Sequence, residues 1–371
     1  MFKPFVTQAD HSWLPTIHGL RAFAIMAVLV SHSYHSPDWA FGNVGVAVFF
    51  SISGFLSYYV LYRDEQHLGR IDYNYFLLRR ILRIWPAALV VILLATLFAS
   101  GAARTNATAV SLFTFSINWD MVFFTGWPLP NLAPLWSIAV EQQFYVLAPF
   151  MYRLLRSRYA LGFCIAVFAL SNLGRYVHIV MLSDQAGNGG LYYATYAYLD
   201  TFLAGAIVAH LFLGGRKISA CMQWWAFIIS TMLLLAILRI WGGIVFPPYA
   251  SFTLLPYLLM PMAVTLLLLS VMPMQQGSTA FAKLLVSRPF TVVGTLSYSL
   301  YLIHLLVLEY THGYHLAVQY VACLLAAALL YVLVEKPFLK YKSQARKGIG
   351  QYPWPALLVW AVLALGTLSY W

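Results

Sequence analysis

Two basic side chains stand eleven residues apart in an apolar stretch near the start of the chain. The segment GLRAFAIMAVLVSH holds Arg21 and His32, and eleven residues at 100° each make three turns plus about 20°, so both side chains share one helix face. Imidazole accepts a hydroxyl proton near neutral pH. We therefore predict a functional pair. The alternative is that Arg21 extends along the helix toward water and His32 is a hydrogen-bonded helix histidine.

A carboxylate and two hydroxyl groups repeat at one-turn spacing in LWSIAVEQQFYVLAPF. Ser137, Glu141 and Tyr145 lie at i, i+4 and i+8, which predicts one polar stripe. A buried carboxylate pairs with a cation or takes up a proton. Glu141 is a candidate catalytic group, and a structural ion pair is the alternative.

A second histidine shares a helix face with hydroxyl groups in GTLSYSLYLIHLL. Ser297, Tyr301 and His304 lie at i, i+4 and i+7, again on one helix face. In YAYLDTFLAGA, Asp200 lies one turn after Tyr196. We expect Asp200 to orient another residue or a backbone group rather than to react.

Three arginines stand close together in RRILRIWP. Arg80 and Arg83 are i, i+3 neighbours and Arg79 precedes them. Forked guanidinium groups suit bidentate contacts with phosphate. The alternative is that these arginines only mark the cytoplasmic end of a membrane span.

These residue types together suit acyl transfer, with imidazole as base, a carboxylate to orient it and arginines for a phosphorylated donor. The sequence shows no G-x-S-x-G elbow, P-loop or H-E-x-x-H motif. We expect no metal ion.

The elements that must position these residues are membrane helices. The chain of 371 residues is 62% hydrophobic and 9% charged, and its mean hydropathy is +0.76. Apolar runs of about 20 residues, the length that crosses a bilayer, recur to the C-terminus. The composition predicts an all-α polytopic integral membrane protein of ten or eleven spans, with residues 101–134 as its longest loop. The predicted spans are 16–36, 42–62, 82–101, 134–152, 159–181, 193–213, 222–242, 250–272, 290–309, 315–334 and, as an eleventh helix, 353–371.

The distribution of cations predicts the orientation. With the N-terminus in the cytoplasm, the inner segments hold most Lys and Arg residues, and the opposite side keeps Arg104, Arg175 and Arg239. The net charge is +11. Because the cations lie on the inner segments, as membrane insertion alone would place them, we expect no nucleic-acid partner.

Taken together, the motifs resemble those of the membrane-bound acyltransferase family 3, which includes bacterial O-acyltransferases of glycans. Five segments carry the resemblance, in family order: GLRAFAIMAVLVSH, GVAVFFSISGFL, RRILRIWP, LWSIAVEQQFYVL and LSYSLYLIH. DTFLAGAIVAHL and VEKPFL are weaker matches. The family often has a second acid where this chain has Gln142.

The resemblance implies a single transmembrane acyltransferase-3-like domain over residues 1–371 in a bacterial inner membrane. Its members transfer an acyl group, commonly acetyl from acetyl-CoA, to a hydroxyl of a glycan, a lipid-linked glycan or another acceptor, as in modification of cell-envelope polysaccharide. By the resemblance, Arg21 and His32 form the essential pair, Arg80 and Arg83 contact the acyl-CoA, and Glu141 and His304 belong to the active cavity. Ser137, Tyr145, Asp200 and Tyr301 would support them.

We therefore predict an acyl-CoA-dependent O-acyltransferase with His32 as base. The alternative is a transporter or proton-coupled carrier that uses the same intramembrane polar residues without group transfer.

Overall fold

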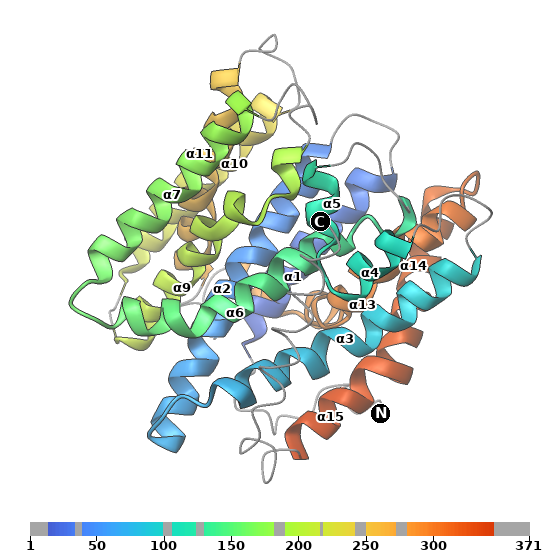
Figure 1. The fold of residues 1–371 in the computed structure, drawn as a ribbon, viewed down its shortest axis with the longest axis horizontal. Coiled ribbons are helices and arrows are strands. Elements are labelled where there is room, and N and C mark those ends of the chain that lie inside the picture. The colour runs from blue at the N-terminus through green and yellow to red at the C-terminus, as the bar shows by residue number, and fades with distance from the viewer. Residues whose placement is uncertain are drawn as a thin grey trace. The chain divides into compact units, whose positions relative to one another are not determined.

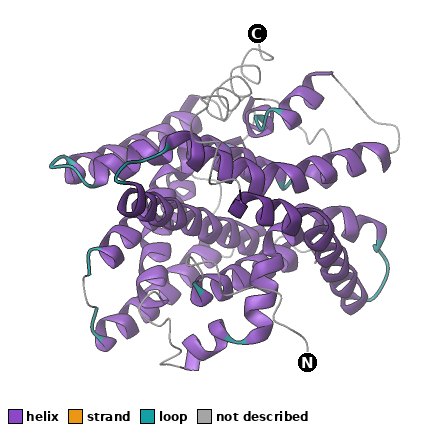
Figure 2. Cartoon of the chain, turned by 90° about the horizontal axis from the view of Figure 1, so that it is seen from below, coloured by secondary structure: helices purple, strands orange, loops and turns teal. Residues whose placement is uncertain are grey.

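The structure, a computed structural model, is helical throughout its described part (Figure 1). It describes residues 14–33, 39–98, 106–123, 130–181, 190–215, 218–241, 250–271 and 280–344. These residues contain no strand, as Figure 2 shows. The long helices are α1 (Pro15–Ser33), α2 (Trp39–Leu68), α3 (Tyr73–Phe98), α6 (Leu135–Leu155), α7 (Ala160–Met181), α9 (Leu199–Leu213), α10 (Ala220–Trp241), α11 (Ala250–Val271), α13 (Arg288–Tyr310) and α14 (Leu316–Leu330).

Shorter elements join the long helices. They are α4 (Asn106–Phe113), α5 (Ile117–Phe123), α12 (Ala280–Val286), α15 (Lys336–Gln344), the 3₁₀ turns η1 (Pro130–Leu132), η2 (Gly190–Tyr193) and η3 (Thr195–Tyr198), and the π-helical turn η5 (Tyr331–Glu335).

The fold class predicted from composition is confirmed. Ten of the eleven predicted spans coincide with long helices, and the eleventh, residues 353–371, lies outside the described residues. Among the described residues, seven helical segments are long and apolar enough to cross a membrane. Those seven leave out α1, α3 and α6, the helices that carry the Arg21 and His32 pair, the arginines and the Glu141 stripe. The other candidate residues, Asp200 on α9 and Ser297, Tyr301 and His304 on α13, lie on helices that are among the seven.

One predicted boundary was wrong for a local reason, and the predicted longest loop contains two short helices. Helix α3 begins at Tyr73 rather than near residue 82, because the Asp72 carboxylate accepts the backbone N–H of Tyr75 at 2.9 Å and caps the first turn. The segment 101–134, predicted as the longest loop, contains the short helices α4 and α5. A turn at Phe115, with φ at 53°, and a hydrogen bond between Ser111 and Asp120 join these two helices.

The chain groups into two compact units. Unit 1 comprises residues 1–60 and 204–298, and unit 2 comprises residues 61–203 and 299–371. Helices α2, α9 and α13 contribute residues to both. The single domain over residues 1–371 stays a prediction.

Unit 1 relies on glycines where helix backbones approach closely. A Cβ at Gly205 of α9 would meet the carbonyl oxygen of Ser51 on α2, and a Cβ at Gly294 of α13 would meet that of His18 on α1. Small residues permit such close contacts between membrane helices. In the same unit, α10 and α11 lie side by side (Figure 1).

Unit 2 is built around α6. This helix packs against α3, α5 and α7, and the rings of Phe144 on α6 and Phe202 on α9 stack at 4.0 Å between centroids. Helix α15 lies beside α3 (Figure 1). The arginines of α3 and the polar stripe of α6 therefore belong to one packed unit.

Replacement of Gly205 tests the close helix contact in unit 1. Gly205→Ala places a methyl group against backbone atoms of Ser51 and Phe55, which cannot rotate away, so we expect a loss of about 1 to 3 kcal/mol of stability. Gly162→Ala is the control, because nothing lies within 4 Å of its added Cβ. Thermal unfolding in detergent measures both variants. A Gly205→Ala protein as stable as the Gly162→Ala protein would contradict the contact.

Candidate active site

Arg21 is buried in unit 1 and held by a side chain from a distant helix. It is 8% exposed, and its Nε donates to Ser297 Oγ at 3.0 Å. Ser297 in turn donates to the carbonyl oxygen of Gly294 at 2.8 Å. Two motifs that the sequence offered separately thus meet here, and the close approach at Gly294 brings α13 to α1.

His32 lies in the last turn of α1, in the same unit, with an exposed side chain. Its Nδ1 lies 2.9 Å from the carbonyl oxygen of Val28. A carbonyl oxygen can only accept, so Nδ1 carries the hydrogen, and the neutral ring has its basic lone pair on Nε2. The backbone of α1 itself therefore sets the tautomer in which Nε2 is the basic nitrogen.

The three arginines of α3, in unit 2, have different surroundings. Arg79 forms an ion pair with Asp64. Arg80 is 7% exposed, and its guanidinium carbon lies 5.2 Å from the ring centroid of Phe76 and 4.7 Å from that of Tyr145. Arg83 is half-buried and makes no ion pair or hydrogen bond within the part of the chain that the structure describes.

The polar stripe predicted on α6 makes hydrogen bonds at both of its ends. The Tyr145 hydroxyl donates to the Glu141 carboxylate, and Glu141 is half-buried. Ser137 Oγ lies 2.6 Å from the Tyr301 hydroxyl and 3.1 Å from the carbonyl oxygen of Pro134. Since Ser137 gives its one hydrogen to Pro134, Tyr301 is the donor in the first of these bonds.

His304 is fully buried in unit 2, at 0% exposure. Its Nδ1 lies 2.8 Å from the carbonyl oxygen of Tyr301, so its neutral ring also has the lone pair on Nε2. Both candidate histidines are thus oriented by backbone carbonyls of their own helices.

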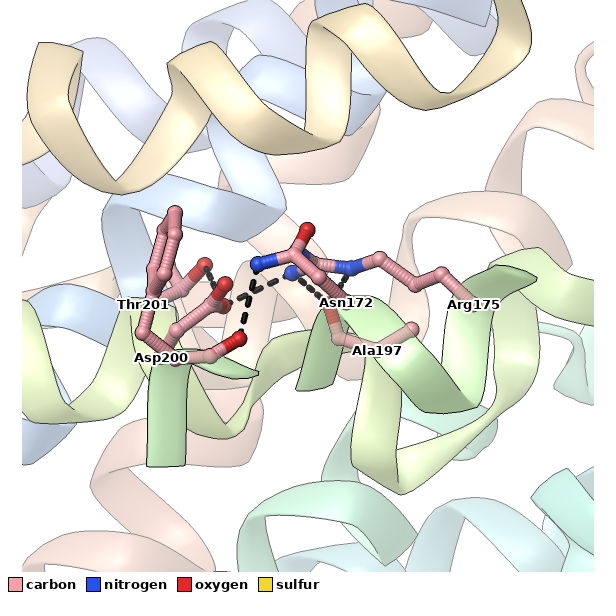
Figure 3. Close-up of polar contacts among 6 residues, drawn as sticks. Asn172, Arg175, Ala197, Asp200 and Thr201 are labelled. Carbon is pink, nitrogen blue, oxygen red and sulfur yellow. Dashed lines mark hydrogen bonds and ion pairs between the residues drawn. The ribbon is translucent and has the colours of Figure 1, made fainter. Parts of the chain in front are cut away.

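Asp200 pairs with Arg175, a partner that sequence reasoning missed. Figure 3 shows the Arg175 guanidinium directed toward Ala197 and Asp200. Arg175 Nη2 lies 2.7 Å from Asp200 Oδ1 and 2.6 Å from the carbonyl oxygen of Ala197, and Nη1 donates to Asn172 at 2.8 Å. Both ionic side chains are 2% exposed or less. Asp200 therefore helps to hold α7 to η3 and α9.

One sequence signal could have found this pair. The buried residues of α7 are Ser171, Arg175, His178 and Ile179, a mostly polar face on an otherwise apolar helix. His178 Nδ1 lies 2.5 Å from the Tyr196 hydroxyl, so the face is polar over two turns. Such a face must meet polar groups on a neighbouring element.

The structure therefore assigns Arg21, His32 and Ser297 to unit 1 and the other candidate residues to unit 2. Among the residues described, no group of three or more His, Cys, Asp or Glu side chains could hold a metal ion. The sites offer imidazole, carboxylate, hydroxyl and guanidinium groups, which suit proton transfer and anion binding.

Comparison with known proteins identifies the family. The chain belongs to the acyltransferase-domain family, whose model matches residues 14–368. This match confirms the resemblance drawn from the motifs.

The curated relatives are longer proteins. The O-acetyltransferase OatA of Staphylococcus aureus strain NCTC 8325 is 26% identical over 375 residues, which cover 91% of this chain and 59% of that protein. The OatA proteins of strains COL and MRSA252 give the same values. The chain thus spans about three fifths of the length of the relatives that it matches. No solved structure matches it.

The ion pair of Arg175 and Asp200 is open to a stability test. Asp200→Leu leaves a buried guanidinium without its counter-charge, so we expect a loss of about 3 to 5 kcal/mol. The double variant Arg175→Met with Asp200→Leu removes both charges and should recover most of that loss. Thermal unfolding in detergent compares the three proteins. A double variant no more stable than Asp200→Leu alone would show that the pair is not what the single change disrupts.

Proposed function

We propose that the chain is an integral membrane O-acyltransferase that moves an acyl group, commonly acetyl, from acyl-CoA to a hydroxyl of a glycan or a similar acceptor. The observation that carries this proposal is the His32 ring, whose bond to the Val28 carbonyl leaves Nε2 as the basic nitrogen. Membership of the acyltransferase-domain family supports it. So do relatives named O-acetyltransferase.

Arg83 is the residue that we propose as the main contact for the donor phosphates. Arg79 already has the Asp64 carboxylate as a partner, and Arg80 is enclosed by aromatic rings. Arg83 is half-buried and has neither kind of partner among the described residues. A partly desolvated guanidinium without a carboxylate or aromatic partner is stabilised more by a bound phosphate than one that already has such a partner.

The proposed reaction is a direct transfer. The acceptor hydroxyl attacks the thioester carbonyl, and His32 Nε2 takes the hydroxyl proton as the new C–O bond forms. The C–S bond then breaks, and the proton passes to the CoA sulfur. An O-acyl ester and free CoA result. Glu141 and His304 in unit 2 are proposed as groups that stabilise developing charge.

We further propose a cytoplasmic N-terminus in a bacterial inner membrane, with the acyl-CoA on the cytoplasmic side. The distribution of Lys and Arg residues supports this orientation. A cell-envelope polysaccharide is the proposed acceptor class.

Replacement of His32 tests the base. His32→Gln keeps a polar side chain but removes the basic nitrogen, so we expect transfer to fall by about 10² to 10⁴. His312→Gln is the matched control, since His312 is exposed just beyond α13. Release of CoA from acetyl-CoA with a glycan acceptor measures the rate. Normal transfer by His32→Gln, at normal membrane expression, would remove His32 from the mechanism.

Replacement of Arg83 tests the donor contact. Arg83→Gln removes one charged hydrogen-bond donor, so we expect the KM for acetyl-CoA to rise roughly tenfold or more with little change in kcat. Arg239→Gln on α10 is the control, because Arg239 is exposed and lies in unit 1. An unchanged KM for Arg83→Gln would contradict the proposal and show that other residues contact the donor.

The wild-type protein tests the activity itself. Purified protein with acetyl-CoA and a glycan acceptor should release CoA and form an acyl ester in equal amounts, which mass analysis of the glycan detects. No release with any acceptor hydroxyl would contradict the proposed activity and favour the alternative of a proton-coupled carrier.

A further inference from the structure

A π-helical turn interrupts the helix that runs from α14 into α15, and a proline explains it. Pro337 has no backbone N–H, so it cannot donate to the carbonyl four residues earlier. The turn η5 (Tyr331–Glu335) widens the helix at this point, and the Lys336 N–H bonds to the Tyr331 carbonyl oxygen, five residues back. Such π-turns occur often at functional sites.

The turn carries a buried carboxylate. Glu335 is 4% exposed and Tyr331 is 7% exposed, and both are the buried residues of η5. Ser299 Oγ on α13 donates to Glu335 Oε2 at 2.8 Å. An acidic side chain is thereby fixed inside unit 2, where its burial is costly unless other groups compensate it.

Glu335 belongs to a turn that packs against α3, the helix of the proposed donor contact. Turn η5 packs against α3, and the Tyr331 hydroxyl is within electrostatic range of both Glu335 and Arg83. Arg80 has a similar neighbour, because the Glu141 carboxylate acts on it. Glu335 and Arg83 therefore lie on two packed elements of unit 2, within range for charge to act over distance but without an ion pair between them.

We propose that the Glu335 carboxylate tunes the affinity of the donor site by weakening phosphate binding at Arg83. The inference rests on the proposed function. A carboxylate near a cation repels an anion bound there, and the repulsion is strong where the surroundings are poor in water. Glu335 then keeps the product CoA, which has the same phosphates as the donor, from binding too tightly to leave.

The direction in which CoA affinity changes on replacement of Glu335 distinguishes this role from a purely structural one. Removal of the Glu335 charge strengthens the attraction between Arg83 and phosphate, so CoA binds more tightly and turnover slows at product release. A residue that only holds the fold would, when changed, disturb Arg83 and weaken CoA binding.

The experiment compares CoA binding to purified wild-type protein and to Glu335→Gln by calorimetry. A unit charge at about 10 Å in surroundings of effective dielectric constant near 20 changes affinity roughly tenfold. We expect CoA to bind Glu335→Gln about tenfold more tightly, with a lower KM for acetyl-CoA and a lower kcat. Glu335→Asp keeps the charge and should bind CoA within about twofold of wild type.

Two further variants control for other effects. Ser299→Ala removes the hydrogen bond to Glu335 and keeps the charge, so its CoA affinity should match wild type. Glu309→Gln makes the same chemical change at an exposed carboxylate on α13 and should leave affinity unchanged. Thermal unfolding verifies that each variant is folded.

The outcomes distinguish this inference from the proposed function. Equal or weaker CoA binding by folded Glu335→Gln, with normal binding by wild type, overturns the role of Glu335 alone. If Glu335→Gln does not fold, wild-type CoA affinity, within about twofold, for both Ser299→Ala and Glu335→Asp supports the role of the charge, whereas weaker or tighter binding by either variant overturns it. No CoA binding by wild type overturns the donor proposal and this inference together.

Discussion

Charged and hydrogen-bonding groups inside a membrane protein must be satisfied by the protein, because lipid offers them no partners. Several buried polar side chains in the described part of the chain follow that constraint. Arg175 is fully buried and donates to Asp200, Asn172 and the Ala197 carbonyl. Arg21 donates to Ser297. These contacts connect helices that would otherwise associate through apolar surfaces alone, so polar satisfaction and helix packing depend on each other.

The three arginines of α3 can be ranked by how completely other groups of the protein satisfy their charge. Arg79 is neutralised by Asp64, and Arg80 lies over the rings of Phe76 and Tyr145. Arg83 has no ion pair or hydrogen bond from the described residues. The three arginines thus have different roles. Arg79 forms an ion pair, Arg80 packs against aromatic rings and Arg83, as we propose, binds an anion. The ranking comes from the elements around α3, since the arginines themselves are chemically identical.

Backbone chemistry places several of these side chains. Gly294 lets α13 approach α1 closely, which brings Ser297 to Arg21. The Asp72 cap starts α3 early, so the arginines lie within the helix and not at its end. Pro337 widens the turn that presents Glu335. A carbonyl of the same helix sets the tautomer of His32 and of His304. The site residues therefore depend on backbone features as much as on side-chain contacts.

The sequence by itself determined the helical membrane class, ten helix positions and the family, because run length, hydropathy and motif order are local properties of the chain. It also predicted which residues share a helix face, as with Tyr145 and Glu141. It did not pair Arg175 with Asp200, or Ser137 with Tyr301, which are 164 positions apart. Nor did it show that Arg21 meets Ser297 across 276 positions. Periodicity fixes the direction of a side chain relative to its own helix, whereas the identity of its partner depends on which helices pack together. The tertiary structure decided those pairs, the differing surroundings of the arginines and the inward position of Glu335.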